Sequence, residues 1–364
     1  MRKSILFIFV FLIAFHAIGQ RLEKNAQMER AVNEAASKFM SDSGHIGLSI
    51  GIIKGVKKFS YNFGTIEKGK NVRPSVHTLY EIASVTKSFT GILLAHAILE
   101  KRIGLTDSVQ KYVPLLDNLT YHGTPVTIFN LAGHTSGLPK FVPMPPAGQS
   151  PVDYWTTHPA ISEENFLDEL AKIKPTVKPG ATFIYSNADT QLLGIILERI
   201  YHMSFAELIK KYITGPVHME KTGIEIADTN EFAKGYNSKG ELEPGLTWWD
   251  KIPAAASLRS DVEDMLNYLQ LNLNENDPAI MLAHKPIQQV TYEGAESIGL
   301  YWMNKKTKKG YREIFHAGGS AGHTSYCIIC PQTQTGIVCF ANDAGPDTEH
   351  ALKAMADQIL DVIN

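Results

Sequence analysis

The sequence predicts an α+β fold, in which one antiparallel sheet is flanked by terminal helices and carries an inserted, mostly helical lobe. Two observations support this class. Strand-like runs occupy both ends of the chain, over residues 45–64 and 298–341, whereas helical patterns dominate between them to about residue 272. Amphipathic helical stripes precede the first strands and follow the last ones. If the strands at both ends of the chain share one sheet, the helical middle of the chain is an inserted lobe.

The composition is that of a globular protein. The chain has 364 residues, of which 44% are hydrophobic and 20% are charged, and its formal net charge is −2. Phosphate binding needs a concentrated basic face, so this near-neutral balance argues against a nucleic-acid partner. We expect a small-molecule or peptide substrate as the partner, and the sequence does not indicate an oligomeric state.

The first 19 residues predict a secretory signal peptide. A basic head at Arg2 and Lys3 is followed by an apolar run and then by small residues before a cleavage site after Gly19. The apolar run is short compared with the ~20 residues of a membrane span. We therefore expect an exported protein, periplasmic or secreted, with no stable membrane span after signal cleavage.

Residues 20–364 are expected to form a single domain of two lobes. The predicted α/β lobe comprises about residues 24–83 and 285–364, and the predicted helical lobe comprises about residues 84–284. The composition and length suit one large domain or two lobes with a substantial core.

The first elements follow from the spacing of apolar residues. Between residues 28 and 39 these residues recur at helical spacing. Residues 45–53 and 58–64 are rich in branched and aromatic side chains and predict two strands, joined by a tight turn at Lys54-Gly55. A long apolar helix is expected to begin at Ser84. Later helices are predicted over residues 188–201 and 261–271.

The last third of the chain returns to a strand pattern. Strands are predicted over Ile298–Trp302, Glu313–His316, Thr324–Cys330 and Gly336–Ala341, with a hairpin turn between the last two. A closing helix carries an apolar stripe from Leu352 to Ile363.

Three cysteines fall in this last segment. Cys327 and Cys330 form a Cys-x-x-Cys pattern, but on a strand residues three apart point to opposite faces and cannot be bridged. We interpret the cysteines as buried core residues, and a cross-strand bond from one of them to Cys339 remains open.

The most informative stretch begins at Ser84, ahead of a long apolar run. Ser84 and Lys87 are three residues apart, so on a helix the amine approaches the hydroxyl. Ser-x-x-Lys is an arrangement in which the amine and its partners take the proton of a nucleophilic hydroxyl. The same spacing also fits a helix N-cap serine beside a solvated lysine.

A second candidate segment holds Tyr185 and Asn187, in a loop just before the predicted helix of residues 188–201. A tyrosine beside an ammonium group has its phenolate stabilised, which makes it a usable general base. The alternative is that Asn187 only caps the helix.

A third segment runs from His316 through Ala317 to Gly318 and Gly319, at the end of a predicted strand. Small residues there let a substrate lie against the backbone, where an amide can donate to an oxyanion. The alternative is a glycine-rich turn with an incidental histidine. Residues 318–322 also match the Gly-x-Ser-x-Gly nucleophile elbow, which we reject because a strand, not a helix, follows.

Metal and cofactor sites are not indicated. No histidine pair has the helical spacing of a zinc site, and no glycine-rich phosphate loop follows a strand. We therefore expect neither a metal nor a cofactor.

In this order, Ser84-x-x-Lys87, Tyr185-x-Asn187 and His316-x-Gly318 resemble the serine β-lactamase and penicillin-binding-protein-like superfamily. The resemblance is strongest to the branch of class C β-lactamases, D-alanyl-D-alanine peptidases and carboxylesterases. It covers roughly residues 30–362. Further similar blocks lie at residues 103–114, 134–139, 188–198 and 257–265.

The resemblance implies a role for each motif residue. Ser84 would be the acylated nucleophile, Lys87 its activating amine, and Tyr185 the group that shuttles the proton. Asn187 would bind a substrate amide or carbonyl. The backbone N–H groups of Ser84 and Gly319 would form the oxyanion hole, and a helix start at Ser84 would favour the developing charge.

One departure bears on the substrate. Many β-lactamases carry Lys-Thr-Gly or Lys-Ser-Gly at the third motif, where this chain has His316-Ala317-Gly318. Histidine is mostly neutral near pH 7 and alanine supplies no hydroxyl, so a substrate carboxylate would be held less well. We therefore expect an ester or a D-amino-acid amide or peptide as substrate, ahead of efficient β-lactam hydrolysis. The alternative from another class is a non-catalytic envelope binder or sensor.

Overall fold

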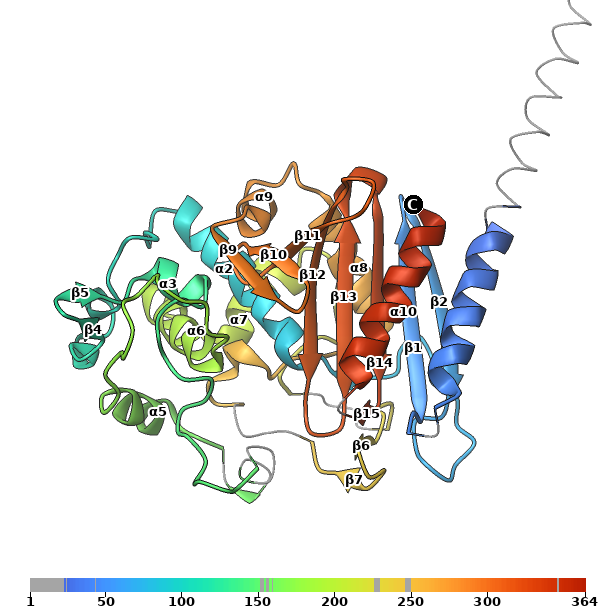
Figure 1. Ribbon diagram of the computed structural model, residues 1–364, viewed down its shortest axis with the longest axis horizontal. Coiled ribbons are helices and arrows are strands. Elements are labelled where there is room, and N and C mark those ends of the chain that lie inside the picture. Colours follow the sequence, from blue (N-terminus) through green and yellow to red (C-terminus); the bar gives the residue numbers. More distant parts are fainter. Residues whose placement is uncertain are drawn as a thin grey trace, which may run out of the picture.

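An eight-stranded antiparallel sheet organises the molecule (Figure 1). The computed structural model describes residues 23–364 apart from residues 24, 43, 151–153, 155–156, 159, 226–229, 246–249 and 346. The predicted signal peptide lies outside the described residues. The strand order is β2-β1-β14-β13-β12-β11-β10-β9, so the two ends of the chain meet at the pairing of β1 with β14. The α+β class with an antiparallel sheet is confirmed.

The strands of this sheet have the following bounds: β1 Gly47–Lys54, β2 Lys57–Gly64, β9 Gln288–Tyr292, β10 Ala295–Ile298, β11 Met303–Lys306, β12 Arg312–Gly319, β13 Thr324–Cys330 and β14 Thr335–Ala341. Smaller pairings join β3 (Tyr80–Glu81) to β8 (Arg259–Ser260), β4 (Thr120–Tyr121) to β5 (Thr124–Pro125), and β6 (Gly235–Asn237) to β7 (Leu242–Glu243) and β15 (Asp343–Ala344).

The two terminal helices cover one face of the sheet, as the sequence predicts (Figure 1). A helix over residues 25–40 and α10 (Thr348–Ile363) bury apolar side chains against this face. Period-two alternation directs Ile328 of β13 into this core, while its neighbours Cys327 and Ile329 enter the core on the other face.

The opposite face is covered mainly by α8 (Val262–Leu273), which packs on β1, β13 and β14. Beyond it lies the helical region, which also contains α2 (Thr86–Leu99), α3 (Ile128–Ala132), α5 (Glu163–Leu170), α6 (Asn187–Tyr201), α7 (Phe205–Ile209) and α9 (Pro278–His284). The 3₁₀ turns are η1 (Ala83–Val85), η2 (Val109–Lys111), η3 (Pro114–Leu116), η5 (Pro253–Ala255) and η6 (Pro331–Thr333), and a π-helical turn follows α7 at Lys210–Thr214.

Helix α2 runs through the centre of the molecule and is buried on almost every side. It packs against α6, α9 and the turn η5. A helix that is apolar all round is typical of such a position. Gly91 allows one close approach, because an added Cβ would lie only 2.0 Å from the carbonyl oxygen of Leu300.

The structure corrects two predicted elements. The turn between the first two strands lies at Gly55-Val56 and not at Lys54-Gly55, because Gly55 adopts a positive φ of 61°. The predicted strand Ile298–Trp302 is wrong beyond its first residue. Residues 299–302 instead form the connection from β10 to β11, in which Tyr301 has a φ of 63°. Residues 300–302 are buried, and their large apolar side chains therefore resemble those of a buried strand.

The three cysteines are buried and unpaired in the structure. Cys327 and Cys339 enter the cores on opposite faces of the sheet, which excludes a bond between them. Burial raises the pKa of the Cys327 thiol to about 12, so this thiol stays protonated. The interpretation as core residues is confirmed.

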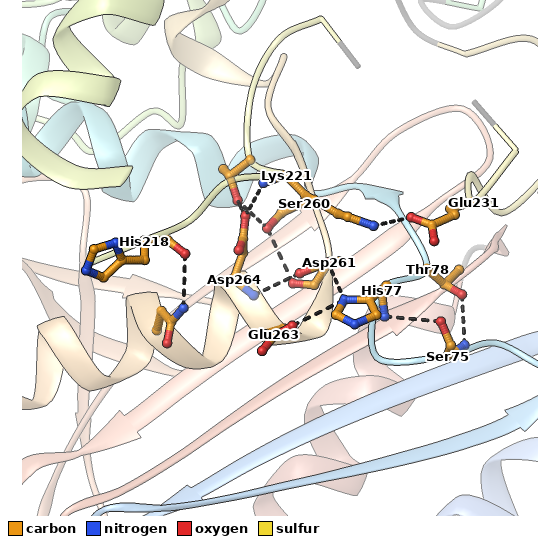
Figure 2. A network of polar contacts seen from close by, with 12 residues as sticks. Ser75, His77, Thr78, His218, Lys221, Glu231, Ser260, Asp261, Glu263 and Asp264 are labelled. Carbon is orange, nitrogen blue, oxygen red and sulfur yellow. Dashed lines mark hydrogen bonds and ion pairs between the residues drawn. The ribbon is translucent and has the colours of Figure 1, made fainter. Parts of the chain in front are cut away.

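A network of polar contacts fixes the start of α8 (Figure 2). The Asp261 carboxylate caps the helix by accepting from the Asp264 backbone N–H at 2.8 Å. Asp264 accepts from the Lys221 backbone N–H and from the Thr222 hydroxyl, both at 2.8 Å. His77 lies 3.5 Å from Asp261. Three segments far apart in the sequence are thereby joined. Within the described residues, no helix combines the length and apolar character needed to cross a membrane.

Candidate active site

Ser84 lies in the 3₁₀ turn η1, directly before α2. This corrects the prediction that the α-helix begins at Ser84, because α2 begins two residues later at Thr86. The preceding residue, Ala83, has a positive φ of 44°, an unfavourable conformation for alanine of the kind that is concentrated at functional sites. The short turn presents the serine at the junction between the sheet and the helical region.

Strand β12 passes very close to this turn. A Cβ added at Gly318 would lie 2.5 Å from the carbonyl oxygen of Ile82 and 2.9 Å from the backbone nitrogen of Ser84. Only glycine permits this approach. The contact between β12 and η1 brings the third predicted motif beside the nucleophile.

Lys87 is hydrogen-bonded to the nucleophile and completely buried. Its Nζ donates to Ser84 Oγ at 2.9 Å and to the carbonyl oxygen of Ala255 at 2.9 Å. The side chain is 0% exposed. Burial, reinforced by the charge of Lys140, lowers the pKa of Lys87 well below its ordinary value. A deprotonated amine at this place can take the proton of the serine hydroxyl.

Tyr185 completes the group around Ser84. Its ring lies 4.9 Å from Lys87 Nζ and stacks on Tyr292 at a centroid distance of 5.4 Å. Burial raises the pKa of Tyr185 well above its ordinary value, although a hydrogen bond to Ser84 opposes this shift. The shift is opposite to the expected stabilisation of the phenolate. The physical reason is that burial of the phenol outweighs the stabilisation that a neighbouring group gives to its phenolate.

Asn187 is the first residue of α6, and it does not cap the helix. The capping residue is Ser186, whose hydroxyl accepts from the Asp189 backbone N–H at 3.2 Å. The Asn187 backbone N–H donates to the carbonyl oxygen of Lys140 at 2.9 Å. Its side-chain Oδ1 is buried without a hydrogen-bond partner among the described residues. The amide is therefore available to a substrate.

His316 is a neutral acceptor in this structure. Its Nδ1 lies 2.7 Å from the carbonyl oxygen of Ala317, and a carbonyl only accepts, so Nδ1 carries the proton. Burial, reinforced by Lys87, lowers the pKa of His316 to about 3. Its Nε2 therefore keeps a lone pair. The described residues offer this buried atom no partner.

A cavity of about 450 Å³ joins these residues. Its wall includes Ser84, Tyr185, Asn187, His316, Gly318 and Gly319, and Lys87 reaches Ser84 from behind. The structure thus brings all seven predicted site residues together. A larger hollow of about 740 Å³ lies beside α7 and residues 214–225, but none of these seven residues lines it.

Comparison with known proteins decides the family. The model of the family described as Beta-lactamase matches residues 32–361. The chain belongs to the Beta-lactamase family. Among solved structures, this family member superposes on a class C β-lactamase with a TM-score of 0.78 at 22% identity, covering 92% of this chain and 96% of that one. A β-lactamase/D-alanine carboxypeptidase from Yersinia pestis superposes with a TM-score of 0.79 at 24% identity, covering 93% and 99%. At these identities the superpositions show the fold.

Two curated relatives extend the comparison. Protein flp of Staphylococcus aureus (strain COL) is 30% identical over 318 residues, which cover 82% of this chain and 60% of that protein. This chain therefore spans well under two thirds of that relative's length. The D-alanyl-D-alanine-carboxypeptidase/endopeptidase AmpH of Escherichia coli (strain K12) is 27% identical over an alignment of 383 positions, gaps included, which covers 100% of this chain and 96% of that protein.

The sequence did not predict a role for His134 and Asp189, a buried pair beside Tyr185 in this β-lactamase-family site. The Nδ1 of His134 lies 3.3 Å from the Asp189 carboxylate, and its ring lies 4.7 Å from the Tyr185 ring. Ser136 donates to Asp189 at 2.5 Å. Burial raises the pKa of Asp189 well above its ordinary value. The similar block at residues 134–139 was the available signal, but it could not show that the loop supports the tyrosine.

The charged part of the cavity wall could not be predicted from the sequence motifs. Lys140, Glu293 and Glu349 line the cavity, and no motif spacing connects them. They meet only because the loop after α3, the β9–β10 hairpin and the start of α10 converge on Ser84. Among the described residues, no group of three or more histidine, cysteine or acidic side chains is placed to hold a metal ion.

Proposed function

We propose that this β-lactamase-family protein is an exported serine hydrolase that cleaves esters or D-amino-acid amides and peptides through an acyl-enzyme on Ser84. One observation carries the proposal. Ser84 Oγ is hydrogen-bonded at 2.9 Å to a fully buried lysine and opens onto a cavity. A buried cation costs free energy unless it is paired, and the part of the chain that the structure describes gives Lys87 no carboxylate partner. The lysine therefore fits a base better than a structural charge.

Acylation would begin with transfer of the Ser84 proton to the Lys87 amine. The serine oxygen then attacks the substrate carbonyl carbon, and the oxyanion accepts from the backbone N–H groups of Ser84 and Gly319. Each such donor contributes on the order of 3 kcal/mol to transition-state stabilisation. The Tyr185 hydroxyl passes a proton to the leaving group and is reprotonated from Lys87. The leaving group departs with that proton as the acyl-enzyme forms.

Deacylation would use the same groups in reverse. A water takes the place of the leaving group and gives a proton to the Tyr185–Lys87 pair as it attacks the ester carbonyl. The oxyanion again lies at the two backbone N–H groups, and Ser84 leaves with a proton. The neutral tyrosine hydroxyl suits this relay, because it donates and accepts without holding a charge.

The third motif supports the choice of substrate. His316 is neutral and Ala317 has no hydroxyl, so this wall holds a carboxylate weakly. In the β-lactamases that carry Lys-Thr-Gly or Lys-Ser-Gly, this motif holds the substrate carboxylate. We therefore rank esters and amides ahead of β-lactams, while allowing slow β-lactam turnover. The name of the relative AmpH includes endopeptidase, a cleavage within a peptide that needs no terminal carboxylate in the cleft, and this supports the peptide part of the proposal.

Labelling and turnover test the proposal together. A fluorescent penicillin and a fluorophosphonate should each label the protein, and Ser84→Ala should abolish the label. Turnover of p-nitrophenyl esters and D-alanyl amides should exceed that of nitrocefin. Ligand binding by calorimetry with neither labelling nor turnover would instead support a non-catalytic binder. Export is tested by N-terminal sequencing of protein from the envelope or medium, which should begin at Gln20.

A further inference from the structure

We propose that the cleft selects substrates that carry an ammonium group, and that Glu349 binds this group. The inference rests on the proposed hydrolase function, because it concerns the substrate class of the same cavity. Two observations support it: the position of the Glu349 carboxylate, and the unpaired hydrogen-bond acceptors of the cavity wall beside it.

Glu349 is placed to meet a bound substrate. It is the second residue of α10, it is half-buried, and it lines the cavity together with Ser84 and Gly319. A Cβ added at Gly319 would lie 4.0 Å from its Oε2, so the carboxylate reaches the strand end that would supply the oxyanion donor. Neighbouring Glu293 lies 3.3 Å from His350 Nε2.

The adjacent wall holds two buried acceptors that have no partner among the described residues. His316 is 3% exposed, lines the cavity, and offers a buried Nε2 lone pair that has no partner among the described residues. Asn187 Oδ1 is a second such acceptor. An ammonium group has three N–H donors and no acceptor, whereas a carboxylate has acceptors only. A carboxylate would face lone pairs and a like charge on this wall, and an ammonium group would satisfy them.

The remaining charges of the cavity agree with this polarity. Among the described residues that line it, Lys140 is the only lysine or arginine. Its carbonyl oxygen accepts from the Asn187 backbone N–H. Burial, reinforced by Glu293, raises the pKa of Glu349, and the charges of His350 and Lys140 oppose this shift. The Lys140 side chain is exposed and its Nζ lies 5.2 Å from the ring of Phe141. Two carboxylates, Glu293 and Glu349, thus line the cavity against this one cation, a balance that favours a cationic substrate.

Matched thioesters test the inference on the leaving-group side. S-acetyl-2-(dimethylamino)ethanethiol, whose protonated amine keeps an N–H donor, S-acetyl-2-mercaptoethanol and S-acetylthioglycolate carry cationic, neutral and anionic leaving groups. They form the same acetyl-enzyme, so their kcat/KM values differ only in binding and acylation. A second trio of D-alanine p-nitroanilides, with a free amine, an N-acetyl group or an N-succinyl group, places the charge on the acyl side. In at least one trio, we expect the cationic member to exceed the anionic one by about tenfold or more, as for a charged hydrogen bond.

Variants then assign the preference to one residue. Glu349→Gln should lower the cation-to-neutral ratio of kcat/KM by about tenfold. Glu349→Lys should reverse the order of the cationic and anionic members, which a merely damaged variant cannot do. Glu296→Gln changes the net charge equally at an exposed position on β10 outside the cavity, and it should keep the wild-type ratio.

The outcomes separate this inference from the function on which it rests. Hydrolysis of the neutral members without a cation preference in either trio would overturn the inference and leave the hydrolase proposal standing. A cation preference that persists in Glu349→Gln would likewise overturn the inference and leave the hydrolase proposal standing. Absence of any turnover, together with absence of a serine-directed label, would overturn both.

Discussion

The cleft around Ser84 and the network at the start of α8 are both rich in buried polar groups, yet they use them in opposite ways. In the network, Asp261, Asp264 and His77 are paired with each other or with neighbouring segments (Figure 2). In the cleft, His316 Nε2 and Asn187 Oδ1 are buried without a partner among the described residues. Leaving a buried polar group unsatisfied costs about 1–3 kcal/mol, so the cleft is kept at some cost in stability.

The difference separates residues that hold the fold from residues that await a substrate. Substitutions in the network should lower stability and leave the chemistry intact, whereas substitutions in the cleft should do the reverse. Active-site residues are often arranged at the expense of stability in this way.

The largest expected effect is that of Lys87→Met. Removing the base should lower kcat/KM for a p-nitrophenyl ester by about 10³-fold or more. Because the lysine is fully buried and disfavoured as a cation, the apolar variant should be at least as stable as the wild type in urea unfolding. A variant that lost stability but kept its activity would place Lys87 among the structural residues.

Gly318→Ala should have the next largest effect. The added Cβ would meet the carbonyl oxygen of Ile82 at 2.5 Å and the Ser84 nitrogen at 2.9 Å, so strand or turn must shift. A displacement of about 1 Å at the nucleophile can reduce the rate about 100-fold. Gly310→Ala is an informative control, because Gly310 has open space around it but a positive φ of 81°. It should cost stability only. Equal losses of activity in both variants would contradict the close-approach argument.

Asp264→Ala tests the network side of the comparison. It leaves the Lys221 backbone N–H and the Thr222 hydroxyl without this acceptor, and we expect a loss of about 2 kcal/mol in the free energy of unfolding. The specific activity of the folded protein should stay within about twofold of the wild type, because Asp264 does not line the cavity around Ser84. A large fall in kcat with unchanged stability would show that the two regions are coupled.

His316→Asn gives the smallest effect and tests a pH dependence. The pKa of His316 is lowered to about 3 in the folded protein. Between that value and the ordinary pKa near 6.5, the unfolded chain binds the additional proton, so stability falls as the pH falls through this window. On going from pH 7 to pH 5, the wild type should lose about 1–2 kcal/mol more than the variant. Equal losses, measured by urea unfolding at both pH values, would mean that His316 is not held neutral.

The sequence predicts more of this molecule than of its substrate. The pairing of β13 with β14 follows from local alternation and a turn. Six of the seven motif residues line one cavity and Lys87 is hydrogen-bonded to Ser84, as the order of motifs implies. The 3₁₀ turn at Ser84 and the connection at residues 299–302 were missed because tertiary contacts override local patterns. No sequence motif pointed to Glu349, because its place on the cavity wall depends on where α10 begins relative to β12.

The most direct test of the central claim is mass spectrometry of the intact protein after incubation with a fluorophosphonate, followed by peptide mapping. We predict one adduct, located on Ser84, that is absent from Ser84→Ala and forms much more slowly in Lys87→Met. No adduct on the folded wild-type protein, or an adduct that persists in Ser84→Ala, would contradict the assignment of Ser84 as a nucleophile activated by Lys87.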